Sequence, residues 1–126
     1  MAFKLGKRSR EQLLGVHPHI VAVVERAIEI TTIDFVVFEG RRTLARQREL
    51  VAAGASRTMN SRHLTGHAVD LVPIFEGKVS WRDALFPRLA EAVKQARNEL
   101  EIPLENGFDL WGWDMPHWQL PRDRYP

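Results

Sequence analysis

The feature that most constrains the fold is a carboxylate inside an apolar run. Asp70 stands at the centre of residues 68–72, Ala-Val-Asp-Leu-Val, whose β-branched composition predicts a buried strand. An unpaired carboxylate is costly to bury there, so the fold must bring partner groups to Asp70. His63 comes from the preceding loop, and Gly66 between them permits the close backbone turn that lets both side chains meet at one metal ion.

A second pair of polar residues lies near the end of the chain. Asp114 and His117 are three residues apart, and Pro116 between them disfavours a regular helix, so we expect His117 to begin a strand and Asp114 to lie on the loop entering it. His63, Asp70 and His117 then form a set of two imidazoles and one carboxylate that can hold Zn²⁺ with an open fourth position. Asp114 can serve as a general base toward a metal-activated water that cuts an amide bond.

Arg42 and His67 each allow two interpretations. Arg42 immediately precedes an expected helix, where a guanidinium can stabilise a developing oxyanion or bind a substrate carboxylate, but the adjacent Arg41 fits simple solvent exposure equally well. His67 follows His63 by four residues, which on a helix would place both on one face. Gly66 and the β-branched residues after it disfavour a helix, so we expect His67 at the edge of the site or at the surface.

Three tryptophans surround the second pair. Trp111 and Trp113 can form the wall of a binding groove or belong to the core, which is the usual place of a large aromatic side chain. Trp118 alternates with His117 along the expected strand and therefore faces the other side of the sheet. We expect Trp118 in the core.

Composition limits the class of protein. The 126 residues suffice for one domain with one core, and we expect residues 1–126 to form a single domain. There is no cysteine, so any metal needs His, Asp or Glu ligands. A net charge of +2, without a helix-turn-helix or a basic stripe with interleaved aromatics, disfavours nucleic-acid binding. We find no membrane-spanning run and no signal peptide.

Apolar periodicity and turn residues predict an α+β fold, with helices packed on a small and mainly antiparallel sheet. We expect helices after a Ser9–Gln12 capping box, from Pro18, from a Thr43 cap to Ala53, and from Trp81 to Pro103. The apolar helix faces are Ile20, Val23, Val24, Ala27 and Ile28, and Leu85, Leu89, Val93, Ala96 and Leu100. Strands are expected at 33–38, at 68–72 closed by Pro73, and at 117–120, with turns at Glu76-Gly77 and Asn106-Gly107.

Three segments together match one family signature, and they occur along the chain in the order that the signature requires. They are Ser61-x-His63-x-x-Gly66-x-Ala68-x-Asp70, Asp114-x-x-His117, and Glu39-Gly40-Arg41-Arg42-Thr43. This pattern resembles that of the peptidase M15 metallopeptidases, the VanX/VanY-like or LAS group. The opening residues 3–13 resemble the start of the phage endolysin branch, the L-alanyl-D-glutamate peptidases. An aspartate at position 114, where the dipeptidase members have glutamate, favours the same branch.

The resemblance implies a hedgehog/DD-peptidase-like fold with a zinc site on the sheet and a peptidase that cuts peptidoglycan stem peptides. It assigns six positions: zinc ligands His63, Asp70 and His117, catalytic base Asp114, carbonyl-polarising Arg42, and Ser61 orienting a ligand or touching substrate. Two imidazoles and one carboxylate favour zinc, although manganese or cobalt can substitute.

The leading hypothesis is therefore a phage or prophage endolysin, a zinc L-alanyl-D-glutamate endopeptidase. We expect a monomer without a separate wall-binding domain, with no nucleic-acid partner and no stable membrane insertion. We expect it to reach the periplasm and cell wall from the host cytoplasm through a holin pore. Two alternatives remain open: a D-alanyl-D-alanine dipeptidase or carboxypeptidase of the same superfamily, and a non-catalytic domain that binds wall peptides.

Overall fold

The computed structural model describes residues 2–126. Its helices are α1 (Lys7–Gln12), α2 (Pro18–Ile30), α3 (Leu44–Ala52), α4 (Phe86–Leu100) and α5 (Gly107–Trp111), with short 3-10 turns η1 (Arg62–Thr65) and η2 (Asp83–Leu85). Its strands are β1 (Phe35–Glu39), β2 (Ala68–Phe75), β3 (Lys78–Val79), β4 (Glu105–Asn106) and β5 (His117–Gln119). The predicted α+β class is confirmed.

The strands form one antiparallel sheet around β2. The order is β1-β2-β5-β4, and β3 extends β2 as a hairpin. Both turn residues of that hairpin, Glu76 and Gly77, have positive φ (52° and 77°), as a two-residue hairpin turn requires. The central position of β2 matters for function, because it sets Asp70 between neighbouring strands on both sides.

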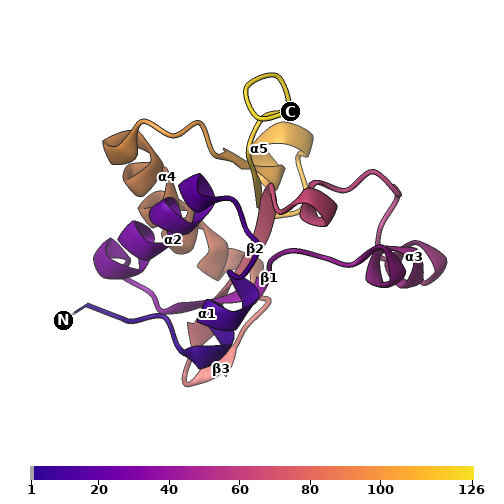
Figure 1. Ribbon diagram of the computed structural model, residues 1–126. Coiled ribbons are helices and arrows are strands. Elements are labelled where there is room, and N and C mark those ends of the chain that lie inside the picture. The colour runs from indigo at the N-terminus through magenta and orange to yellow at the C-terminus, as the bar shows by residue number, and fades with distance from the viewer. Residues whose placement is uncertain (1) are drawn as a thin grey trace.

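Two helices cover one side of this sheet. Figure 1 shows α2 and α4 side by side, and both contribute to the buried core together with β1, β2 and β5. The predicted apolar face of α2 is buried in full, and Trp118 lies in the core with no exposed surface, as expected. Helix α3 stands apart from this pair across the strands (Figure 1).

The predicted capping box at Ser9 is wrong. Helix α1 begins at Lys7, with Gly6 rather than Ser9 in the N-cap position, and no side chain caps it. Ser9 is instead buried inside the helix, where its Oγ accepts a hydrogen bond from the backbone N–H of Val37 at 3.0 Å. The hydroxyl is therefore used to join α1 to β1, a tertiary contact that local sequence spacing does not reveal.

Two other boundaries also differ from the prediction. Strand β2 continues through Pro73. The carbonyl oxygen of Pro73 accepts a hydrogen bond from the Ser80 N–H at 2.9 Å, and the sheet needs no N–H donor at this position, so the missing N–H of proline does not end the strand. The last long helix begins at Phe86 rather than at Trp81, and Leu100 at its end is 42% exposed rather than part of the core. Trp81 instead packs edge-on against Phe38.

The segment predicted as an Asn106-Gly107 turn is a helix start. Asn106 belongs to β4 and caps α5, with its side-chain oxygen accepting from the N–H of Phe108 at 3.1 Å. Its side-chain amide also donates to the carbonyl oxygens of Met115 and His117. Asn106 thus fixes the loop that leads into β5.

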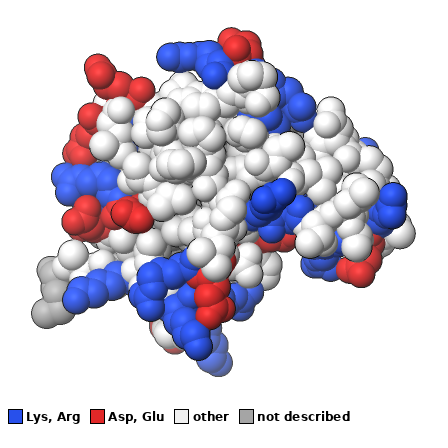
Figure 2. All heavy atoms as spheres, viewed as in Figure 1, with Lys and Arg blue, Asp and Glu red and all other residues white. Residues whose placement is uncertain are grey.

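The surface is mixed in charge. On the face shown in Figure 2, Lys and Arg side chains alternate with Asp and Glu around a largely uncharged centre. Among residues 2–126, no helix combines the length and the apolar character that a membrane crossing requires.

Candidate metal centre and active site

Three side chains from three elements converge where β2 pairs with β5. Asp70 on β2 and His117 on β5 are direct partners in the antiparallel register, and His63 comes from η1. Asp70 Oδ1 lies 3.2 Å from His63 Nε2 and 3.5 Å from His117 Nδ1. The potential ligand atoms of all three lie within 4.8 Å of one another. The structure therefore brings together the three residues that the sequence proposes as metal ligands.

The turn that delivers His63 depends on Gly66. This glycine ends η1 in the left-handed conformation, with φ of 76°, which glycine adopts at little cost. A side chain there would also collide with the backbone, since an added Cβ would lie 2.2 Å from the carbonyl oxygen of Gly15. The close approach predicted for this position is confirmed.

Hydrogen bonds on the outer sides of the two rings fix their orientation. His63 Nδ1 lies 2.8 Å from the carbonyl oxygen of Gly40, and a carbonyl oxygen only accepts, so Nδ1 carries the proton and the lone pair of Nε2 faces Asp70. His117 Nε2 lies 2.9 Å from Gln119 Oε1, which in the same way leaves its Nδ1 lone pair facing Asp70. Such outer partners are the usual companions of metal-binding histidines.

This arrangement fits a divalent metal ion. The imidazole lone pairs of His63 and His117 face Asp70 Oδ1 at 3.2 Å and 3.5 Å. All three atoms are acceptors, so they repel one another unless a cation or shared protons lie among them. Two nitrogens and one oxygen are also the ligand set of open zinc sites.

The electrostatics of the three groups agree with this view. Burial alone would raise the pKa of Asp70, but His63 and His117 outweigh it and hold that pKa far below its usual range. Burial would lower the pKa of His117, but the interaction with the negatively charged Asp70 overcomes it and raises that pKa. Asp70 is therefore a carboxylate, the form that binds metal.

Gly40 holds the carbonyl that orients His63, and its position leaves no room for a side chain. An added Cβ would lie 1.8 Å from the carbonyl oxygen of Gln12. We expect Gly40→Ala to lower the free energy of unfolding by about 3 kcal/mol, because backbone on both sides must move. Urea unfolding measures this, with Gly6→Ala as the matched control.

Gly6 is the control because an added Cβ there meets nothing within 4 Å and its φ of −79° suits any residue. It caps α1, so alanine is expected to cost less than about 1 kcal/mol. Equal losses in the two variants would contradict the proposed packing of Gly40.

Asp114 lies on the loop entering β5, as predicted. Its backbone is in the left-handed region, with φ of 62°, and its carbonyl oxygen accepts from the His117 N–H at 3.2 Å. Gly107 packs beneath it, since an added Cβ there would lie 2.5 Å from the Asp114 carbonyl oxygen. Burial raises the pKa of the Asp114 carboxyl, and the neighbouring Asp70 adds to this while His117 opposes it.

Arg42 is held inside the site rather than in solvent. Its side chain is 8% exposed, and its guanidinium donates to Glu39 Oε1 and, at 2.7 Å, to Gln47 Oε1. Its third nitrogen, Nη2, lies 4.0 Å from Asp70 Oδ2. Between the two interpretations of Arg42, the structure therefore excludes the solvent-exposed one.

Ser61 and His67 have different positions relative to the site. The Oγ of Ser61 accepts from the backbone N–H of His63 at 3.2 Å and so caps η1, which supports the expectation that it orients a ligand. Ser61 also lines the cleft beside the site. His67 contacts Thr65 Oγ1 and lies near His17, outside the three-residue cluster, in line with the edge or surface position expected for it.

An open cleft of about 520 Å³ lies over the cluster. It is bordered by α3, the 55–60 loop and the loop after α5. Trp111 and Trp113 line it and are about half exposed, so these two tryptophans form a groove wall and are not core residues. The ring of Trp111 lies 5.5 Å from that of His117, and Arg57 lies over Trp113 at 5.0 Å.

Sequence reasoning missed two glutamines that support the site. Gln47 on α3 is fully buried, and its amide nitrogen donates to Ser56 Oγ and to the Thr58 carbonyl oxygen while its oxygen receives Arg42. Nothing in a lone polar residue on a helix signals this. Gln119 carried a usable signal, because it stands two residues after His117 on a strand and therefore on the same face.

Comparison with known proteins places this site in a family. A family model described as phage L-alanyl-D-glutamate peptidase matches residues 1–118. The L-alanyl-D-glutamate peptidase of Escherichia phage T5 is 36% identical over 129 residues, covering 99% of this chain and 94% of that protein. The crystal structure of Serratia marcescens L-Ala D-Glu endopeptidase ChiX superposes with a TM-score of 0.89 and 46% identity, covering 95% and 91% of the two chains. This chain therefore belongs to the phage L-alanyl-D-glutamate peptidase family.

Proposed function

We propose that this protein is an endolysin that hydrolyses the amide bond between L-alanine and D-glutamate in peptidoglycan stem peptides, with a metal ion held by His63, Asp70 and His117. Membership of the family supports the bond, and both similar proteins carry this activity in their names. The observation that carries the metal-dependent part is the convergence of three acceptor atoms within 4.8 Å at the floor of an open cleft.

We propose zinc as the metal. Two imidazoles and one carboxylate form a borderline-soft donor set, which suits Zn²⁺ better than Mg²⁺ or Ca²⁺. When bound, such an ion supplies Lewis acidity, which makes a water a stronger nucleophile and polarises the scissile carbonyl. Gly40 and Gln119, on the outer sides of the rings, keep both imidazoles aimed at it.

The roles of the remaining residues follow from their surroundings. The Asp114 carboxylate takes a proton on one of its oxygens from the attacking water and passes it to the leaving amine of D-glutamate. Its raised pKa, due chiefly to burial, makes it a better proton acceptor than an exposed aspartate. Arg42, held by Glu39 and Gln47, presents a positive charge to the oxyanion that develops on the scissile carbonyl.

The test is product analysis on a purified disaccharide-pentapeptide whose stem ends in D-alanyl-D-alanine. A new D-glutamate amino terminus, with L-alanine left on the disaccharide, is expected from the metal-loaded enzyme and not after chelation. Released D-alanine would instead identify a D-alanyl-D-alanine peptidase, and binding without any product would identify a non-catalytic wall-peptide domain. Metal analysis by plasma mass spectrometry, on protein prepared without added metal, tests zinc separately.

We further propose that the protein works as a single-domain monomer and reaches the wall through a holin pore. Light scattering at micromolar concentration tests the monomer. Lysis of cells that express the protein with and without a holin tests the route, since lysis without a holin would contradict it.

A further inference from the structure

The cleft carries more positive than negative charge. Its lining includes five arginines and three carboxylates, namely Arg42, Arg46, Arg57, Arg62 and Arg122, and Glu39, Asp70 and Asp114. Arg42 is paired with Glu39, and Arg46 with Glu49. Within residues 2–126, the other three arginines have no carboxylate within 4.0 Å. A bound divalent cation would add to this excess, so the cleft attracts an anionic ligand.

Arg62 is the most unusual of the three. It is only 6% exposed, yet its guanidinium meets neutral backbone acceptors, the carbonyl oxygens of Leu120 and Tyr125. Arg122, a second cation, lines the same cleft. A buried cation beside a second cation, without a counter-ion, is a costly arrangement that an anionic ligand would relieve.

Arg122 extends this charge into solvent at the cleft. It is exposed and donates from Nη2 to the carbonyl oxygen of Asn60 at 2.8 Å, which connects it to the loop that borders the cleft. This contact uses one of the five N–H donors of the planar guanidinium group, so the other donors are available to a ligand. A guanidinium group can donate two parallel hydrogen bonds to the two oxygens of a carboxylate.

We propose that Arg122, backed by Arg62, binds a carboxylate of the stem peptide, so that amidation of this carboxylate weakens the substrate. The inference rests on the proposed function, because it takes the stem peptide as the ligand. In that peptide D-glutamate is linked through its γ-carboxyl group, which leaves its α-carboxylate free next to the scissile bond. Diaminopimelate, where present, carries a second free carboxylate one residue further on.

The experiment compares three synthetic stem peptides with the metal-loaded enzyme. One carries the free glutamate α-carboxylate and diaminopimelate, one has the α-carboxylate amidated, and one has lysine in place of diaminopimelate. We expect wild type to show a KM about 10-fold higher for the peptide that lacks the recognised carboxylate, with kcat little changed. In Arg122→Gln this discrimination is expected to vanish, because KM for the full peptide rises to the same value. The peptide affected identifies which carboxylate is bound.

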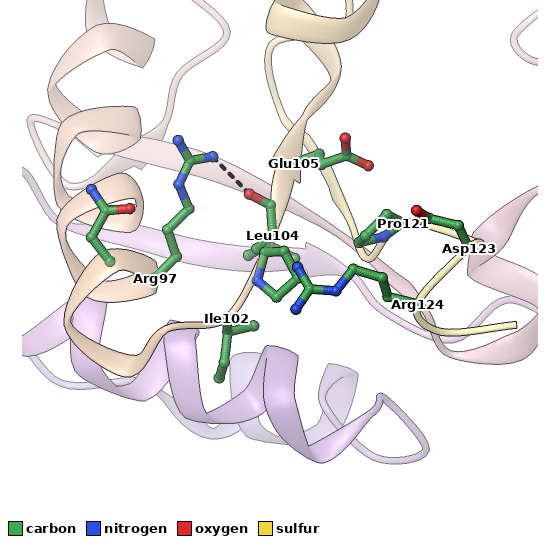
Figure 3. A pocket seen from close by; sticks show the side chains of 9 residues that line it. Arg97, Ile102, Leu104, Glu105, Pro121, Asp123 and Arg124 are labelled. Carbon is green, nitrogen blue, oxygen red and sulfur yellow. Dashed lines mark hydrogen bonds between the residues drawn. The ribbon is translucent and has the colours of Figure 1, made fainter.

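Arg124→Gln is the matched control. Arg124 is two residues away and also exposed, but it lies in a separate hollow with Arg97 and Leu104, where Glu105 and Asp123 supply negative charge (Figure 3). This variant should keep the wild-type discrimination. Arg122→Lys keeps the positive charge but loses the planar guanidinium group, so it is expected to retain part of the discrimination between the peptides.

Three results would overturn the proposal. They are equal KM values for all three peptides with wild type, discrimination that persists in Arg122→Gln, and an equal loss in Arg124→Gln. If wild type cleaved none of the peptides, the proposed function itself would fall, and this inference with it. Cleavage without discrimination would leave the proposed function standing.

Discussion

Replacing Asp114 by asparagine is expected to lower kcat for peptide hydrolysis by about 10²–10⁴-fold while the metal stays bound. The amide cannot accept the proton of the attacking water, whereas the three proposed metal ligands are untouched. Asparagine suits this position, because Asp114 has a φ of 62° and asparagine tolerates the left-handed region well. The expected fall in kcat is therefore due to the missing carboxylate and not to a change in the conformation of the loop.

Kinetics and metal content, measured on the same preparation, check this result. Asp109→Asn is the matched control, since Asp109 lies on α5 just before this loop and pairs with Lys94 outside the cleft. It should keep wild-type kcat and metal content. Activity within a few-fold of wild type in Asp114→Asn would assign the proton transfer to another group.

The convergence of His63, Asp70 and His117 was predictable, because the geometry of paired strands determines which side chains lie together on one face of the sheet. A polar residue at the centre of an apolar strand needs partners on the same face, and a strand that begins with His117 supplies one as soon as the two strands pair. The glycine between His63 and Asp70 adds the one unusual backbone conformation that the loop requires. Each of these features can be read from its own short segment, and the pairing of β2 with β5 then brings the segments together.

The supporting residues could not be predicted in this way, because their partners lie in other elements, which spacing along the chain does not bring together. Ser9 joins Val37, and Arg62 meets Leu120, 58 residues away. Gln47 also serves two loops at once, one of them through Arg42. The packing of α1 on β1 creates the Ser9 contact, the position of α3 beside the 55–60 loop creates the Gln47 contacts, and the packing of η1 against the end of the chain creates the Arg62 contact. The charge excess of the cleft emerges at the same level, since its arginines come from separate segments.

Replacing Asp70 by asparagine should remove the metal altogether. Asp70 is the one carboxylate among the three proposed ligands, and its oxygen is the point on which both imidazoles converge. A neutral amide is a much weaker ligand, so we expect metal affinity to fall by more than the 10–100-fold that changes in outer partners cost, with hydrolysis falling to background. Competition with a chromophoric chelator measures the affinity.

Thermal unfolding with and without added Zn²⁺ separates this loss from misfolding. A ligand at about 100 times its dissociation constant stabilises the folded state by about 2.7 kcal/mol, so wild type and Asp114→Asn should both melt at higher temperature when zinc is present. Asp70→Asn should melt cooperatively, but at a temperature that zinc does not change. If zinc still stabilised this variant as it does wild type, the ion would be held elsewhere, and the assignment of His63, Asp70 and His117 as the metal centre would be wrong.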